Sequence, residues 1–124
     1  MPFDPEPYAE GIRKLNEQEA RETADRAARA RSEASRLADA IGSADQSISK
    51  VYLFGSLVGA GPRRPDFDID LAIQGGDVYR AMEVAERSEW PVDVVQYDRL
   101  PEHVQKRIRE QGRILYHADP TGNQ

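Results

Sequence analysis

The chain lacks cysteine altogether, which excludes a disulfide framework, a thiolate zinc site and a cysteine nucleophile. It also lacks any hydrophobic run of membrane-spanning length, and any basic start followed by an apolar segment. We therefore expect a cytoplasmic protein that makes no membrane contact. No lysine-rich tract is present and the net charge is −5, so direct nucleic-acid binding and a template-directed polymerase are disfavoured.

The length of 124 residues favours a single domain. A modest hydrophobic core fits this length, whereas a separate domain for binding a large acceptor does not. A large substrate would have to be held by a partner or by a second copy, so a homo-oligomer stays open. We divide the domain into an N-terminal arm and long helix over residues 1–49, a core over residues 50–117 and a flexible tail over residues 118–124.

The segment from Tyr8 to Ile41 contains no proline and is rich in Ala, Arg and Glu, which predicts a long helix. A cap at Asn16 would break this helix near its start, and Gly42 is a suitable stop. The apolar stripe consists mostly of alanine and buries little area. Two alternatives stay open: a surface helix anchored through its C-terminal turn, or a helix that contacts a partner.

Beyond this helix, the spacing of apolar residues predicts four strands and three shorter helical segments. The predicted strands cover residues 50–54, 67–73, 91–96 and 113–116, and the helical segments cover residues 57–60, as a short helix or turn, 78–88 and 101–111. Asp77 is a plausible N-cap for the middle one.

The most informative stretch contains Gly55, Ser56, Asp68 and Asp70. Alternate residues of a strand share a face, so Asp68 and Asp70 project together, away from the apolar residues of the same strand. Neighbouring carboxylates repel unless something neutralises them, and Mg²⁺ is usually held by one or two carboxylates together with substrate phosphates. The glycine-serine turn offers backbone and hydroxyl donors for those phosphates. Asp66, at the loop end, is expected to be solvated.

Asp93 lies among valines, in a run that otherwise has the composition of a buried strand. An isolated buried charge is costly and needs a partner, which a metal ion shared with Asp68 and Asp70 would supply. The alternative is a strand-end carboxylate that caps the adjacent loop.

The order Gly55-Ser56, a loop, Asp68-Ile69-Asp70-Leu71 and Asp93 on a later strand resembles the signature of the DNA polymerase β-type nucleotidyltransferase superfamily, in its small stand-alone MNT branch. The likeness extends from about Lys50 to Tyr116. It implies an α+β fold with a small mixed sheet, helices packed on one side and the long N-terminal helix. It also implies that Asp68, Asp70 and Asp93 are catalytic and bind metal, with two Mg²⁺ ions as cofactors and ATP as the substrate.

The resemblance further implies transfer of a nucleoside monophosphate, AMP from ATP, onto a hydroxyl, with Gly55 and Ser56 binding the phosphates. Small proteins of this branch are similar to the antitoxin half of MNT/HEPN pairs, so the implied acceptor is a tyrosine of a HEPN ribonuclease toxin. The arginine that commonly follows the Gly-Ser turn is absent, and Arg63 or Arg64 would have to replace it in nucleotide binding. The alternatives are an antitoxin that acts by binding alone and an aminoglycoside-type transferase for a small molecule.

Overall fold

The computed structural model describes residues 6–118, with side chains from residue 9 onward. Its elements follow the order α1 (Glu6–Ala44), β1 (Ile48–Phe54), the 3-10 turn η1 (Gly55–Leu57), β2 (Ile69–Gly75), α2 (Val78–Ala85), β3 (Val92–Gln96), the 3-10 turn η2 (Tyr97–Arg99), α3 (Glu102–Gln111) and β4 (Arg113–His117). The predicted strands and longer helices are confirmed to within a few residues. The predicted arm and tail lie largely outside the described residues.

The strands form one mixed sheet in the order β3-β2-β1-β4. β1 pairs antiparallel with both β2 and β4, whereas β2 and β3 are parallel. A parallel pair needs a crossover connection, and α2 provides it. Asp77 caps α2 as predicted, because its side chain accepts a hydrogen bond from the backbone N–H of Tyr79 at 2.9 Å. β3 and β4 are therefore the edges of the sheet.

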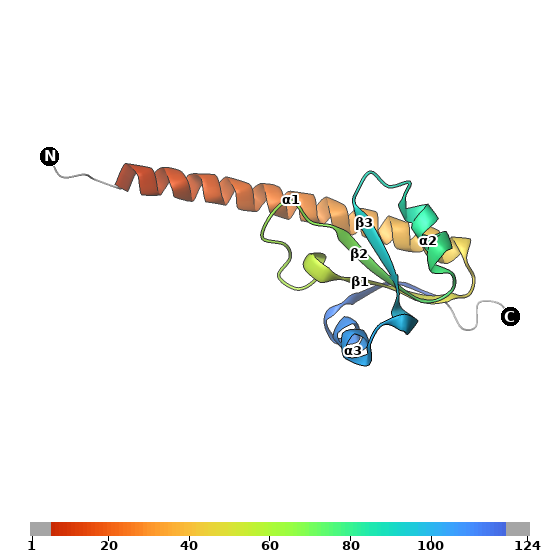
Figure 1. Ribbon diagram of the computed structural model, residues 1–124. Coiled ribbons are helices and arrows are strands. Elements are labelled where there is room, and N and C mark those ends of the chain that lie inside the picture. Colours follow the sequence, from red (N-terminus) through yellow and green to blue (C-terminus); the bar gives the residue numbers. More distant parts are fainter. Residues whose placement is uncertain (1–5, 119–124) are drawn as a thin grey trace.

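Helices cover both faces of the sheet (Figure 1). One face carries Val51, Leu53, Leu71 and Ile73 and packs against α1 and α2 in the main hydrophobic core. The other face carries Tyr52 and Ala72, which pack with Tyr97 and with Ile108 of α3 in a second, smaller cluster. The mixed α+β fold with a long N-terminal helix is as predicted. The prediction that helices pack on one side of the sheet holds for α1 and α2 only, because α3 packs on the other side. The apolar side chains that β1 and β2 present on both faces require the second layer.

α1 is continuous over 39 residues, without the break expected near Asn16, and is about 58 Å long at 1.5 Å per residue. Its second half packs on the sheet through small side chains, with Ala30, Ala34 and Ala38 fully buried. Its first half projects beyond the sheet (Figure 1), and every described side chain from residue 9 to residue 22 is exposed. The helix thus both packs on the core and projects from it.

Gly42 does not stop α1, which ends two residues later at Ala44. A Cβ at position 42 would collide with the ring of Tyr116, so this glycine allows β4 to pack close against the helix. In the described part of the chain, no helix is long and apolar enough to cross a membrane.

Candidate functional site

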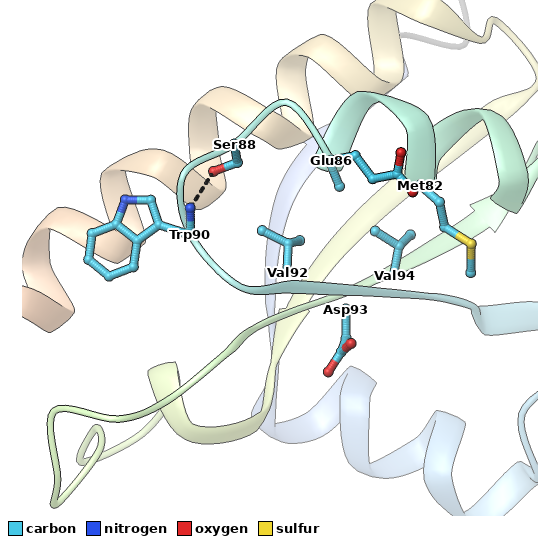
Figure 2. Close-up of a pocket in the computed structure, with 8 residues that line it drawn as sticks. Met82, Glu86, Ser88, Trp90, Val92, Asp93 and Val94 are labelled. Carbon is cyan, nitrogen blue, oxygen red and sulfur yellow. Dashed lines mark hydrogen bonds between the residues drawn. The ribbon is translucent and has the colours of Figure 1, made fainter.

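The central feature of the site is the pairing of Asp70 with Asp93. These residues are register partners in the parallel β2·β3 pair, so their side chains leave the same face of the sheet on adjacent strands. Figure 2 shows the Asp93 carboxylate pointing away from Val92 and Val94, whose side chains face α2. The two carboxylates therefore lie on the face opposite α1 and α2.

The surroundings of Asp70 disfavour its negative charge. Its pKa is raised from the ordinary value of 3.8 to about 6, first by burial and then by the negative charges of Asp93 and Asp68. In the described residues, no arginine or lysine forms an ion pair with any of these three carboxylates. A half-buried carboxylate beside two others, without a compensating cation, is an arrangement that favours a bound metal ion.

Asp68 is the least constrained of the three predicted metal ligands. It is exposed and lies just before β2, which begins at Ile69. Across the described part of the chain, no three His, Cys, Asp or Glu side chains converge closely enough to hold a metal ion by themselves. The Asp70–Asp93 pair still suits Mg²⁺, which needs only one or two carboxylates when substrate phosphates complete its oxygen shell.

The Gly-Ser turn lies directly against Asp70. Phe54, the last residue of β1, is the register partner of Asp70. Gly55 then adopts φ +78°, and a Cβ at this position would collide with the Asp70 carboxylate. Only glycine therefore allows the turn and the carboxylate to approach this closely. Ser56 is exposed in the same turn.

η1 begins at Gly55, two residues before the short helix or turn predicted over residues 57–60. It is a single 3-10 turn of three residues without a side-chain cap. It therefore contributes no appreciable helix dipole, and donors for an anion would have to come from individual backbone N–H groups. An apolar cavity of about 260 Å³ lies beside Gly55, between the turn and α3.

Arg63 and Arg64 do not approach the carboxylates. Arg63 lines a cavity of about 370 Å³ between α1 and the 60–63 loop, beside Thr23. Arg64 is exposed, and neither arginine makes a hydrogen bond or ion pair with another described residue. The structure thus brings Gly55, Asp70 and Asp93 together and leaves both arginines on the loop.

Two arginines of α1 contact this loop instead. Arg31 donates through Nε to the carbonyl of Leu57 at 2.8 Å, and Arg26 donates through Nε to the carbonyl of Pro65 at 2.9 Å. Arg26 also stacks on the Trp90 ring, with 4.5 Å between its Cζ and the ring centroid. Sequence reasoning missed both contacts, because helical periodicity identifies the inner face of α1 but not the carbonyl that each guanidinium meets.

A groove lies at the free edge of β3, on the face of the sheet that α2 covers. It has a volume of about 370 Å³ and is lined mainly by Met82 and Ala85 of α2, by Trp90, and by Val92 and Val94. Its walls are polar as well as apolar, because Glu86, Ser88 and Asp93 also line it (Figure 2). The groove therefore lies mainly on the face opposite Asp70, and Asp93 borders it at the exposed edge of β3.

Comparison with protein families gives one match, to the family described as "Polymerase beta, Nucleotidyltransferase", over residues 38–121. Comparisons with curated proteins and with solved structures find no match. The matched range begins in the second half of α1 and includes the Gly-Ser turn and all three aspartates.

Proposed function

The chain belongs to the polymerase β nucleotidyltransferase family, and from that premise we propose that it transfers AMP from ATP onto a hydroxyl in a Mg²⁺-dependent reaction. Nucleotidyltransferase activity in general follows from the family. The single observation that carries the proposal for this site is the Asp70–Asp93 register pair beside Gly55. A paired carboxylate site next to a close-approach glycine fits a nucleotide whose phosphates carry the metal.

In the proposed reaction, the acceptor oxygen attacks the α-phosphorus and the bond to the bridging oxygen of the β-phosphate breaks. Pyrophosphate leaves, and the hydroxyl proton passes to Asp93, which is exposed at the sheet edge. Two Mg²⁺ ions held by Asp68, Asp70 and Asp93 would neutralise charge on the attacking and leaving oxygens. Asp70 is suited to hold a cation, because its own neighbours disfavour its charge when it is alone.

The turn supplies the rest of the nucleotide contacts. Gly55 and Ser56 would donate backbone N–H groups, and Ser56 its hydroxyl, to the β- and γ-phosphates. Arg63 and Arg64 would reach the phosphates only through movement of the loop that carries them, because Arg63 lies against α1 in this structure. Loops of this kind commonly adjust when a ligand binds.

For the acceptor we propose a tyrosine of a HEPN ribonuclease partner, so that the protein acts as an antitoxin. The resemblance of the Gly55-to-Asp70 signature to small stand-alone transferases supports this choice. The projecting half of α1 supports it too, because an exposed helix that includes Ile12 and Leu15, which are 57% and 67% exposed, offers a surface for a protein partner.

The second candidate function is neutralisation of the partner by binding alone. Two observations favour it: in the described residues no arginine or lysine pairs with the carboxylates, and the first half of α1 projects beyond the sheet. A transferase for an aminoglycoside-like small molecule has less support, since such an acceptor needs an enclosing second domain or a dimer.

Intact-mass measurement of the partner separates the candidates. After incubation with ATP and Mg²⁺, AMP transfer adds one adenylate to the partner, and the Asp93→Asn variant should leave its mass unchanged. A stable complex with an unmodified partner would exclude catalysis and support binding alone. Modification of an aminoglycoside in place of a protein would support the small-molecule reaction.

A further inference from the structure

The outer edge of β3 presents unpaired backbone groups. The backbone N–H of Ile69 on β2 donates to the carbonyl of Pro91 at 2.9 Å, and this bond determines which residues of β3 direct their backbone groups toward β2. Residues of a strand alternate in the side to which their backbone groups point, so those of Val92 and Val94 point away from β2. Within the described residues β3 has a strand neighbour on one side only. A free edge of this kind pairs with another extended chain.

The two faces of this edge strand carry different side chains, and a strand added to the edge would place its own side chains beside both sets. The Asp93 carboxylate points to the carboxylate face, and Val92 and Val94 point to the other face, where they line the groove that Asp93 borders at the strand edge (Figure 2). A segment paired with β3 would direct alternate side chains to the same two faces. One set would lie beside Asp93, and the other set would enter the groove against Met82 and Trp90.

We infer that the acceptor is an extended polypeptide segment that adds to the free edge of β3 and places a tyrosine beside Asp93. This inference rests on the proposed function and names the substrate class of that site. Backbone hydrogen bonds to Val92 and Val94 hold the segment, and the groove receives the side chains on either side of the tyrosine.

The register explains why a tyrosine suits this position. A side chain directly opposite Asp93 starts about 5 Å away. The α-phosphate belongs between Asp93 and Asp70, whose strands are about 4.8 Å apart, so it lies less than one further strand spacing across the sheet. A long side chain spans that distance, whereas a serine hydroxyl ends near its own strand. The phenolic oxygen attacks phosphorus, its proton passes to Asp93, and pyrophosphate leaves.

The test uses synthetic peptides with a single tyrosine, leucine at the two alternate positions around it and lysines at both ends. With Mg²⁺ and ATP, mass spectrometry should detect one adenylate on the tyrosine peptide and none on its phenylalanine counterpart. Two N-methylated versions of the tyrosine peptide, each with the N–H groups along one of its two edges blocked, should differ at least tenfold in the rate of adenylate transfer. Equal rates for the two versions would overturn strand addition.

Two variants on α2 provide a matched pair on the protein side. Met82→Glu places a charge in the groove, and Tyr79→Glu places one at a side chain that is 70% exposed and does not line the groove. Met82→Glu should slow modification of the peptide at least tenfold and leave Mg-ATP affinity unchanged, and Tyr79→Glu should change neither. Equal peptide rates in the two variants would overturn the inference.

Failure of the inference and failure of the proposed function have different signatures. A wild-type protein that does not bind Mg-ATP contradicts the proposed function. A protein that binds Mg-ATP and modifies no tyrosine peptide contradicts only strand addition. In the supporting case, the amides of Val92 and Val94 also become protected from hydrogen exchange when the phenylalanine peptide is added.

Discussion

Arg31 of α1 donates a hydrogen bond of 2.8 Å to the carbonyl of Leu57, the last residue of the turn that begins at Gly55. The same guanidinium lies against Gly61, where a Cβ would come within 2.9 Å of its Nη2 atom. Arg26 bonds the carbonyl of Pro65 further along the loop. The long helix therefore anchors both ends of the loop that joins the Gly-Ser turn to the aspartate strand.

The first prediction concerns this contact. Arg31→Met keeps most of the side-chain stem but removes the donor, so it should lower the free energy of unfolding by about 1 kcal/mol and weaken Mg-ATP binding severalfold. Calorimetric titration with Mg-ATP measures the second effect. Arg29→Met is the control, because Arg29 is exposed on the same helix. Equal affinity in the two variants would show that the contact does not position the turn.

The second prediction concerns Asp70. Its pKa is raised to about 6, so between pH 3.8 and pH 6 the folded state binds more protons than the unfolded state. Stability from this group is thus lost as the pH rises through that window. In EDTA, Asp70→Asn should match the wild type near pH 4 and melt a few degrees higher at pH 7.5.

Thermal unfolding across this pH range, with Asp66→Asn as the control on an exposed carboxylate, measures the difference. A melting-temperature difference between Asp70→Asn and the wild type that does not change with pH would contradict the electrostatic account of the carboxylate pair.

The third prediction concerns Gly55. An alanine there would be strained at φ +78° and would collide with the Asp70 carboxylate, so Gly55→Ala should cost about 1–3 kcal/mol of stability and abolish nucleotide binding. Gly59→Ala is the matched control, because Gly59 also has a positive φ, of 65°, but has open space around its Cβ position. Denaturant unfolding and Mg-ATP titration of both variants measure the two effects. Similar Mg-ATP binding by both variants would contradict the claim that nucleotide binding requires the close approach of Gly55 to Asp70.

The fourth prediction concerns Thr23, which is 3% exposed and whose hydroxyl has no hydrogen-bond partner among the described residues. Thr23→Val removes this unsatisfied polar atom at nearly constant volume and should raise stability by about 1 kcal/mol. Urea unfolding gives the value, and Thr23→Ser, which keeps the hydroxyl, should not be stabilised. A less stable valine variant would mean that the hydroxyl does have a partner in solution.

Most of the fold could be predicted from local patterns. A continuous apolar run identified β1, alternating apolar residues identified β2, and the Asp77 cap marked the start of α2. The second helical layer could not be predicted, because nothing local to Ile108 says which face of the sheet it will cover. Gly42 was misassigned for a related reason: its role depends on Tyr116, which lies 74 residues away in the sequence.

The candidate site could likewise be predicted only in part from the sequence. The approach of Gly55 to Asp70 was expected from their order in the chain, and the register of Asp70 with Asp93 follows from the strands that carry them. Roles for Arg63 and Arg64 rested on their charge and on the absence of the usual arginine after the Gly-Ser turn, and the structure gives them no contact with the carboxylates. The loop contacts of Arg26 and Arg31 are products of tertiary packing, which no spacing rule contains.

The central claim is that Asp70 and Asp93 bind a metal-nucleotide complex at the Gly-Ser turn, and thermal unfolding with added ligands tests it without knowledge of the acceptor. Mg²⁺ and ATP together should raise the melting temperature of the wild type more than ATP in EDTA does. Asp70→Asn and Asp93→Asn should each lose this increment. The same increment in both variants, or none in the wild type, would contradict the account.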